Sequence, residues 1–176
     1  VDSTLLAKVA HDALGDHMIA VTSAGRSIPS RDIERTQQFC AEQGIPQVVM
    51  RFNELEVAGF RENPKDRCYH CKQAIFTALL AAARAQGYGA VMDGTNASDD
   101  AGDRPGMKAL TELNVLSPLR LCGITKAQVR EYSRDAGLFT WHKPAYACLA
   151  TRIPSGVPLT AELLHSVEGA EDALFK

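Results

Sequence analysis

Residues 17–52 read HMIAVTSAGRSIPSRDIERTQQFCAEQGIPQVVMRF. The first seven residues are typical of a short buried strand, and QVVMRF at residues 47–52 is typical of a second one. Between them, Pro29 and Ser30 predict the start of a helix that Gly44 ends. A strand, a helix and a strand in this order predict two parallel strands joined by a crossover helix.

The rest of the chain continues this alternation. It predicts an α/β fold with a Rossmann-like parallel sheet and helices on both faces. Such sheets bind ligands at the carboxyl ends of their strands, so the polar loops after Ser23, Phe52 and Asp93 are expected to line one edge. Further helices are expected at residues 2–14, 67–87, 107–113, 125–136 and from 160, and further strands at 90–93 and 115–121. Residues 2–4 are expected to cap the first of these helices, and Thr125 the helix to residue 136.

The composition is that of one globular domain. The chain has 176 residues, 45% of them hydrophobic and 23% charged, which allows a sizeable core. A net charge of −2 gives no global nucleic-acid footprint, which leaves room only for a local basic patch, and no apolar run approaches the length of a membrane span. Five cysteines in such a chain favour metal binding or catalysis over a secreted disulfide framework. We therefore expect a cytoplasmic protein without a membrane or nucleic-acid partner.

Two of the cysteines, Cys68 and Cys71, form a CxxC pair within RCYHCK, residues 67–72. With Asp66 as the expected N-cap, both sulfurs lie on one face of the first turn of a helix. The helix N-terminus and the flanking arginine and lysine are expected to favour thiolates. The pair could be two ordinary cysteines or a disulfide-exchanging pair. It could also belong to a zinc site, or to an iron–sulfur cluster that takes a third cysteine from elsewhere.

Cys148 is the candidate for that third cysteine. It lies in an irregular, proline-bounded segment, and loops of this kind often carry function. Lys143 and Arg152 flank it and could hold a phosphate or lower the pKa of its thiol. The alternative is a loop cysteine packed under the neighbouring helix. Cys40 and Cys122 are expected to be small buried core residues.

Three polar stretches complete the candidates. Asp2 and Ser3 open a helix and form half of a phosphate-binding signature, although the simpler interpretation is an N-cap. Asp93 with Asn96 could hold a ribose, a magnesium ion or only a backbone turn. Arg104 precedes a helix and could bind a phosphate or a carboxylate, or remain a solvated arginine.

Together these segments resemble a known family. The opening residues VDSTLL resemble the end of the SGGxDS loop of PP-loop ATP pyrophosphatases, without its Ser-Gly-Gly. The chain is similar to the LarE branch of that group over nearly its whole length. Residues 102–106 depart from the family's Asp-Tyr-Arg-Pro-Gly, since the aspartate is displaced and the tyrosine is missing. The similar segments are residues 63–64, 66–72, 93–96, 104–108, 117–119 and 143–156.

The resemblance implies an adenine nucleotide alpha hydrolase-like fold over residues 1–158, with its first strand missing, and the start of a C-terminal region at 159–176. It implies a sulfur transferase that uses ATP and Mg²⁺ to adenylylate a carboxylate of pyridinium-3,5-biscarboxylate mononucleotide and then inserts sulfur, during synthesis of the nickel-pincer nucleotide cofactor. We expect the full-length protein to form a homo-oligomer. Residues 1–176, truncated at both ends, are expected to be weakly active or inactive.

The resemblance also implies the site residues. Some members sacrifice a lone cysteine, at the position of Ala147 here, and others hold a [4Fe–4S] cluster with three cysteines. Cys68, Cys71 and Cys148 match the second pattern, so we favour an oxygen-labile cluster whose open iron handles an extra sulfide. The other implied contacts are Asp2 and Ser3 in the ATP phosphate loop, Thr22, Ser23 and Ala24 near adenine, Asp93 on the nucleotide, and Lys72, Arg104 and Arg152 on phosphate or substrate carboxylate.

Two alternatives stay open. A PP-loop tRNA thiolase also combines such a loop with cluster cysteines, but it needs a tRNA-binding surface that a net charge of −2 does not support. A zinc-stapled, non-enzymatic binding domain would use the three cysteines and one histidine. Metal content and salt-dependent tRNA binding distinguish these alternatives from the cluster enzyme.

Overall fold

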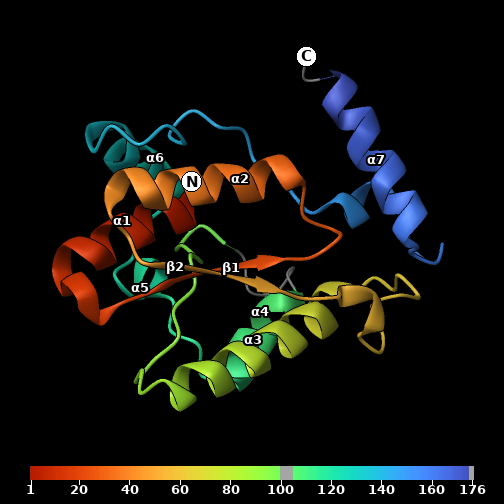
Figure 1. The fold of residues 1–176 in the computed structure, drawn as a ribbon, viewed down its shortest axis with the longest axis horizontal. Coiled ribbons are helices and arrows are strands. Elements are labelled where there is room, and N and C mark those ends of the chain that lie inside the picture. Colours follow the sequence, from red (N-terminus) through yellow and green to blue (C-terminus); the bar gives the residue numbers. More distant parts are fainter. Residues whose placement is uncertain (100–104, 175–176) are drawn as a thin grey trace.

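The computed structural model describes residues 1–99 and 105–174 of the chain. Figure 1 shows strands β1 (Ala20–Ala24) and β2 (Gln47–Arg51) between α1 and α2 on one side and α3 and α4 on the other. This mixed architecture confirms the α/β class. The helices are α1 (Asp2–Leu14), α2 (Ser30–Gln43), α3 (Arg67–Ala85), α4 (Pro105–Glu112), α5 (Pro118–Leu121), α6 (Lys126–Asp135) and α7 (Ala161–Leu174), with short 3-10 helices at Gly15–His17, Glu54–Glu56 and Leu149–Arg152.

The first strand–helix–strand unit forms as the sequence predicts. β1 and β2 pair in parallel, from Ala20 opposite Gln47 onward. Helix α2 connects them, and Gly44 behind it adopts the left-handed conformation, with φ of 66°, that ends a helix at little steric cost. The strand starts later than expected, because His17 belongs to a 3-10 turn.

The other two expected strands are reduced to a single contact in the described residues. Residues 90–93 and 115–121 meet at one isolated parallel bridge, between Met92 and Leu116. Pro118 explains the failure at 115–121, because it has no N–H for a sheet and its fixed φ suits the first turn of a helix. The chain forms helix α5 there instead. The prediction of full strands at both segments was wrong, and the described part of the chain has a sheet of two strands.

A cavity of about 620 Å³ separates β1 from residues 90–94. Apolar side chains of α1 and α3 line it from either side, among them Leu6 and Phe76. Within the described residues β1 pairs with β2 only, so its other edge faces this cavity. Val21 and Val48, on the two strands, line it and are 41% and 45% exposed. An apolar space with a free strand edge therefore lies inside the fold.

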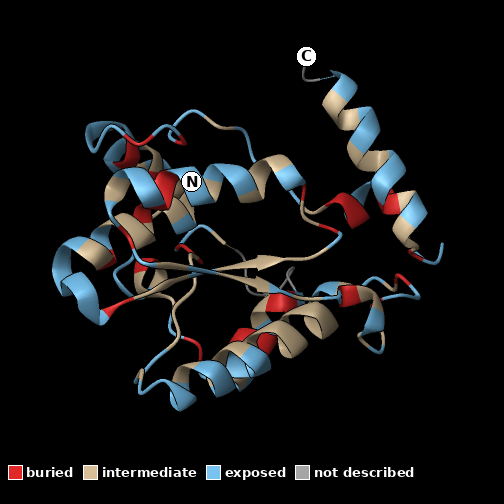
Figure 2. Cartoon of the chain, viewed as in Figure 1, coloured by how far each residue is buried: buried red, intermediate tan, exposed pale blue. Residues whose placement is uncertain are grey.

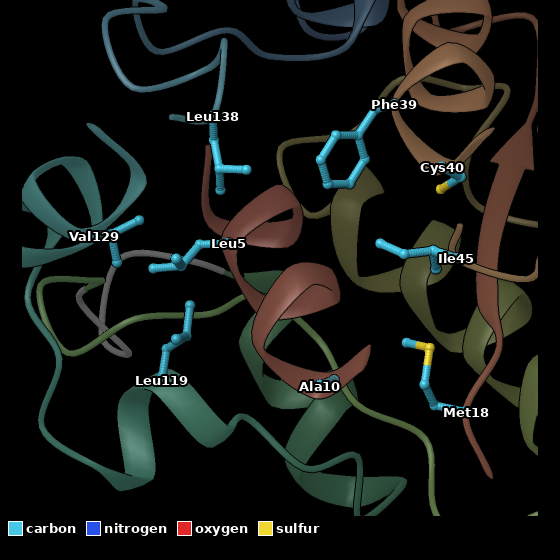
Figure 3. Close-up of a cluster of buried hydrophobic side chains, with 9 residues drawn as sticks. All are labelled: Leu5, Ala10, Met18, Phe39, Cys40, Ile45, Leu119, Val129 and Leu138. Carbon is cyan, nitrogen blue, oxygen red and sulfur yellow. The ribbon is translucent and has the colours of Figure 1, made fainter. Parts of the chain in front are cut away.

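The larger of two buried hydrophobic clusters joins α1, α2, α5 and α6 (Figure 3). Cys40 is one of its members and is 4% exposed, which confirms the prediction that it is a core residue. The cluster consists of Leu5, Ala10, Met18, Phe39, Cys40, Ile45, Leu119, Val129 and Leu138.

The smaller cluster surrounds the segment that follows Cys148. Leu164 of α7 belongs to this cluster and is the buried residue of that helix. Figure 2 colours the other described residues of α7 as intermediate or exposed. The buried members are Phe60, Leu149, Ala150, Ile153, Leu159 and Leu164. Within the described part of the chain, no helix has the length and apolar character that crossing a membrane requires.

Of the predicted helix caps, the cap of α6 forms and the cap of α1 does not. Thr125 accepts the N–H of Gln128 in a capping box at the start of α6. The N-cap of α1 is Val1 and makes no side-chain cap bond, while Asp2 lies in the first turn. The predicted cap at residues 2–4 was therefore wrong, because the Asp2 carboxylate bonds to side chains from other segments.

Candidate functional site

Cys68, Cys71 and Cys148 share one region of the fold, named here the three-thiol site. Cys68 and Cys71 lie in the first turn of α3, and Cys148 immediately precedes the 3-10 helix at Leu149. Cys71 and Cys148 pack against the same hydrophobic cluster, and Cys68 influences the ionisation of both. All three are free, with Cys68 exposed and the other two partly buried. Asp66 occupies the N-cap position of α3 but makes no side-chain cap bond.

Apolar packing fixes two of these thiols. Cys71 and Cys148 both pack against the smaller hydrophobic cluster. Phe60 and Leu149 in that cluster are 2% and 0% exposed. Because Leu149 directly follows Cys148, its burial holds the Cys148 backbone in place.

Cys71 and Cys148 are less acidic than the sequence predicted. Burial raises the pKa of Cys71 to about 12, and the Glu54 carboxylate and the Cys148 thiol add to the shift. Burial also raises the pKa of Cys148, with Cys68 adding to the shift and Arg67 opposing it. The prediction that the helix N-terminus and flanking cations favour thiolates was wrong for these two cysteines, because removal from water outweighs the nearby positive charge.

A polar group gathers around the N-terminus of α1. The Asp2 carboxylate accepts a hydrogen bond of 3.0 Å from Asn96 and an ion pair from Lys126. Ser3 lies against Gly94, where an added Cβ would come within 2.8 Å of the Ser3 nitrogen. The start of α1, the loop after residue 93 and the start of α6 therefore meet. Sequence reasoning missed Lys126, whose one signal is its position at the start of a capped helix.

Asp93 connects this polar group to the CxxC helix. Its carboxylate accepts hydrogen bonds of 2.6 Å from the hydroxyls of Thr95 and Ser117. The Nζ of Lys72 lies 3.9 Å from the same carboxylate. Because Lys72 directly follows Cys71, the three-thiol site and the polar group are neighbours on α3.

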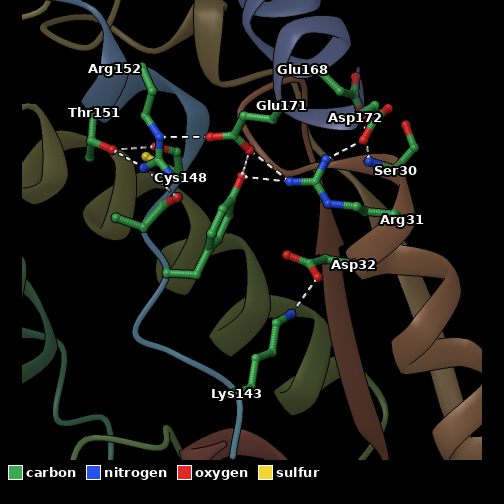
Figure 4. Close-up of polar contacts among 12 residues, drawn as sticks. Ser30, Arg31, Asp32, Lys143, Cys148, Thr151, Arg152, Glu168, Glu171 and Asp172 are labelled. Carbon is green, nitrogen blue, oxygen red and sulfur yellow. Dashed lines mark hydrogen bonds and ion pairs between the residues drawn. The ribbon is translucent and has the colours of Figure 1, made fainter. Parts of the chain in front are cut away.

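Arg152 belongs to a network that ties α7 to the body of the protein (Figure 4). Its Nε donates to Glu171 at 2.8 Å, and its guanidinium lies 4.7 Å from the ring centroid of Tyr146. The Tyr146 hydroxyl donates to Glu171 as well. Arg31 pairs with Glu171 at 2.7 Å and with Asp172. The charge of Arg152 is therefore balanced by a carboxylate from a helix that the sequence left without a role.

Lys143 is also paired, with Asp32 at 2.6 Å. Neither Lys143 nor Arg152 is among the main influences on the Cys148 thiol. The alternative in which these cations lower its pKa is therefore not supported, and their role on a phosphate stays a prediction. Arg152 instead donates to the carbonyl of Ala147 at 3.1 Å, so it supports the backbone next to Cys148.

Of the three residues expected near adenine, Thr22 is engaged between two elements and Ala24 lines a cavity. The Thr22 hydroxyl lies 3.3 Å from the Thr36 hydroxyl and accepts a hydrogen bond of 2.8 Å from Gln47. It is therefore engaged between α2 and β2. Ser23 follows and is half-buried. Ala24 lines a second cavity, of about 520 Å³, at the carboxyl ends of β1 and β2.

Two further predictions have different outcomes. Arg104 lies outside the described residues. Cys122 is exposed behind α5, so the prediction that it is a buried core residue was wrong.

Within the part of the chain that the structure describes, no group of three or more His, Cys, Asp or Glu side chains is close enough to hold a single metal ion. Thiolates around a four-iron cluster each bind a different iron, so they stand further apart than ligands of one ion.

Comparison with known proteins finds relatives along nearly the whole chain. An uncharacterized protein of Synechocystis sp. is 40% identical over 171 residues, which are 97% of this chain and 64% of that protein. The pyridinium-3,5-bisthiocarboxylic acid mononucleotide synthase of Lactiplantibacillus plantarum is 30% identical over 175 residues, 99% of this chain and 63% of the synthase. No family model matches the chain.

A third relative matches a shorter part of the chain. An uncharacterized protein of Methanocaldococcus jannaschii is 33% identical over 113 residues, which are 64% of this chain and 44% of that protein. The chain thus spans less than two thirds of the length of each of these relatives.

Proposed function

We propose that this chain belongs to the LarE branch of the PP-loop ATP pyrophosphatases and forms part of an ATP-dependent sulfur transferase of nickel-pincer cofactor synthesis. Similarity to the L. plantarum synthase over 99% of the chain supports the family. The observation that carries the proposal is the meeting of Cys148 with Cys68 and Cys71, beside the polar group at Asp93. In the proposed reaction, a carboxylate of pyridinium-3,5-biscarboxylate mononucleotide attacks ATP and releases pyrophosphate. Sulfide then displaces AMP from the acyl adenylate and leaves a thiocarboxylate.

We assign the three-thiol site to a [4Fe–4S] cluster held by Cys68, Cys71 and Cys148. The donor set fits this group, because it consists of three free, neighbouring thiols from two segments. As anions these thiols would repel one another and the nearby Glu54 carboxylate, and bound iron compensates that repulsion. Bound there, the cluster would supply one iron without a protein ligand, which can carry a sulfide. The chain's own part is to hold the sulfurs in place and to limit the access of water through the packing under Cys71 and Cys148.

We assign the ATP phosphates and Mg²⁺ to the polar group of Asp2, Asp93 and Lys72. Carboxylate oxygens suit Mg²⁺, and a lysine suits a phosphate. The proximity of Lys72 to Cys71 would bring an activated substrate carboxylate next to the source of sulfur. In this proposal, the apolar cavity between β1 and residues 90–94 receives the first strand of the fold, which would lead its phosphate loop to the start of α1.

Anaerobic reconstitution with iron and sulfide tests the cluster. A brown protein with about four irons and acid-labile sulfide is expected. Cys71→Ala and Cys148→Ala are expected to lose most of this iron. Cys122→Ala is the matched control, because Cys122 is exposed and lies outside the site. A colourless protein that takes up one zinc ion would replace the cluster with the zinc-stapled alternative.

Mass spectrometry after turnover of the full-length protein with ATP, Mg²⁺ and the mononucleotide tests the mechanism. An unchanged Cys148 supports sulfur supplied through the cluster, whereas loss of H₂S from Cys148 would show sacrifice. Salt-dependent binding of tRNA would favour the thiolase instead. Residues 1–176 alone are expected to release little pyrophosphate, and full release would contradict the need for the phosphate-loop glycines.

A further inference from the structure

Glu54 is a buried carboxylate to which the proposed reaction gives no role. It begins the 3-10 helix Glu54–Glu56 behind β2 and is 1% exposed. A carboxylate in such a place is costly unless hydrogen bonds compensate the loss of water. Glu56, two residues later, is exposed, so the burial of Glu54 is specific to that position.

The carboxylate of Glu54 binds the loop that follows β1. It accepts the backbone N–H of Arg26 at 3.1 Å and the backbone N–H of Ser27. Gly25 lies directly against it, because a Cβ added there would overlap the carboxylate oxygens. Hydrogen bonds from N–H groups to an ionised carboxylate are about twice as strong as neutral ones. The loop at the carboxyl end of β1 is therefore shaped around this side chain.

The same loop holds the segment of Cys148. The carbonyl of Ser27 accepts the N–H of Leu149 at 2.8 Å. Leu149 is fully buried and follows Cys148 directly. Ser27 thus links Glu54 to the backbone next to Cys148, because its N–H donates to Glu54 and its carbonyl accepts from Leu149.

Glu54 is also linked to the CxxC helix, because Leu55, the next residue, packs against the same hydrophobic cluster as Cys71. The charge of Glu54 contributes to the raised pKa of Cys71 as well. Cys71 and Cys148 also pack on the same hydrophobic cluster. Glu54 is therefore linked to both segments that supply the three-thiol site, and its hydrogen-bonded link to the Cys148 segment runs through Ser27.

We propose that Glu54 is a positioning residue that sets the spacing between the sulfurs of Cys71 and Cys148, and that it ties this spacing to the loop at the carboxyl end of β1. The inference deepens the proposed function, because a cluster shared by the two segments requires that spacing. It rests on contacts of the chain itself, so it can be tested without a cluster.

Crosslinking of thiol pairs in the iron-free protein measures the spacing. In a Cys122→Ser background, Cys68→Ser leaves Cys71 and Cys148 beside the buried Cys40, and Cys148→Ser leaves Cys68 and Cys71 beside the same Cys40. Dibromobimane bridges each pair, and monobromobimane gives the rate of single alkylation for normalisation. The second pair lies within one helix turn, so it is an internal control that does not depend on Glu54.

Glu54→Gln keeps the size of the side chain but removes its charge and turns an amide toward one of the two N–H groups. The normalised bridging of Cys71 to Cys148 is expected to fall roughly tenfold, the factor that corresponds to about 1.4 kcal/mol, or one charge-assisted hydrogen bond. Bridging of Cys68 to Cys71 is expected to change less than about twofold. Glu54→Asp keeps the charge on a shorter side chain. Its normalised bridging of Cys71 to Cys148 is expected to lie between the values of Glu54→Gln and the wild type.

Glu56→Gln is the matched control and is expected to leave both ratios unchanged. The proposal is overturned if a folded Glu54→Gln or Glu54→Asp protein bridges Cys71 to Cys148 as readily as the wild type. It is also overturned if both thiol pairs change equally, because Glu54 would then support only general stability. Failure of iron to bind would count against the cluster and not against this role, since bridging is measured without iron.

Discussion

The side-chain amide of Asn63 donates a hydrogen bond of 2.9 Å to the carbonyl of Pro154. The same amide reaches the carbonyls of Ile153 at 3.3 Å and Val157 at 3.1 Å. In return, the N–H of Gly156 donates to the Asn63 carbonyl at 2.8 Å. Asn63 is fully buried and lies shortly before α3, so one side chain joins the CxxC helix to the segment that follows Cys148.

Replacing Asn63 is expected to destabilise the protein strongly. Asn63→Gly removes the amide and should cost about 2–3 kcal/mol, because buried carbonyls lose their donor. Asn63→Ala should cost about 1 kcal/mol more, since Asn63 has a φ of 54°, which alanine adopts poorly. Asn63→Asp should be the worst, because it places an unpaired charge against carbonyl oxygens. Midpoints of urea unfolding give the order.

Asn114 is the matched control for the backbone term. It has the same φ of 54° but is exposed. Asn114→Ala is expected to cost only about 1 kcal/mol, and Asn114→Gly close to nothing. An Asn63→Ala protein no less stable than Asn114→Ala would show that the amide contacts contribute little.

The packing of Gly25 against Glu54 gives a second prediction. Gly25→Ala is expected to destabilise the protein by about 1–3 kcal/mol, because the added methyl group overlaps the buried carboxylate. Gly169→Ala should have the opposite sign, a gain of about 0.5–1 kcal/mol, since Gly169 lies inside α7 with open space around it. Thermal unfolding of both variants checks the sign, and a neutral Gly25→Ala would contradict the close contact.

The sequence was informative where structure is local. The two short apolar runs and the helix signals between them in residues 17–52 predict β1, α2 and β2, and the Thr125 cap appears where expected. Residues 115–121 are equally apolar, yet Pro118 starts a helix there and leaves only a bridge at Leu116. One proline outweighs the hydrophobic pattern because it removes a backbone donor.

The sequence predicts the cysteines of the candidate site, but it does not predict the residues that hold the backbone around them. The cysteines are visible as residue types with a spacing. Glu54 acts on Ser27, and Asn63 acts on Pro154, across 27 and 91 residues of chain. No local pattern encodes such a contact, so the sequence gives Glu54 no sign of a role, and it marks Asn63 only through the family resemblance of residues 63–64. The pKa of Cys71 was misjudged for the same reason, because its burial depends on the tertiary fold.

The network around Glu171 predicts an acid-sensitive attachment of α7. Burial pushes the pKa of Glu171 upward, but hydrogen bonds from Tyr146 and Arg31 and the charge of Arg152 outweigh it, so the pKa lies below its ordinary value. A lowered pKa contributes stability above the unfolded-state value of about 4.3, and the contribution is lost as the pH falls through the folded-state value. The melting temperature is therefore expected to fall more steeply below about pH 4.5 in the wild type than in Glu171→Gln.

At pH 7, Glu171→Gln is expected to lose about 2 kcal/mol, or roughly 4–8 °C in melting temperature. Glu162→Gln, in the exposed first turn of the same helix, is the comparison and should lower the melting temperature at pH 7 much less. Parallel pH curves for the wild type and Glu171→Gln would exclude the network as the acid-sensitive element.

The thiols should differ in reactivity in an order that the structure fixes. With a pKa raised to about 12, Cys71 carries very little thiolate at pH 7.5, and the thiolate is the form that reacts. Iodoacetamide at pH 7.5 should therefore label the exposed Cys122 at least about tenfold faster than Cys71, with buried Cys40 slower still. Between pH 7 and 10 the rate at Cys71 should rise roughly tenfold per pH unit, because the thiolate fraction grows by that factor below the pKa. Peptide mapping by mass spectrometry assigns each rate, and a Cys71 that reacts as fast at pH 7 as at pH 10 would contradict its buried, proton-holding state.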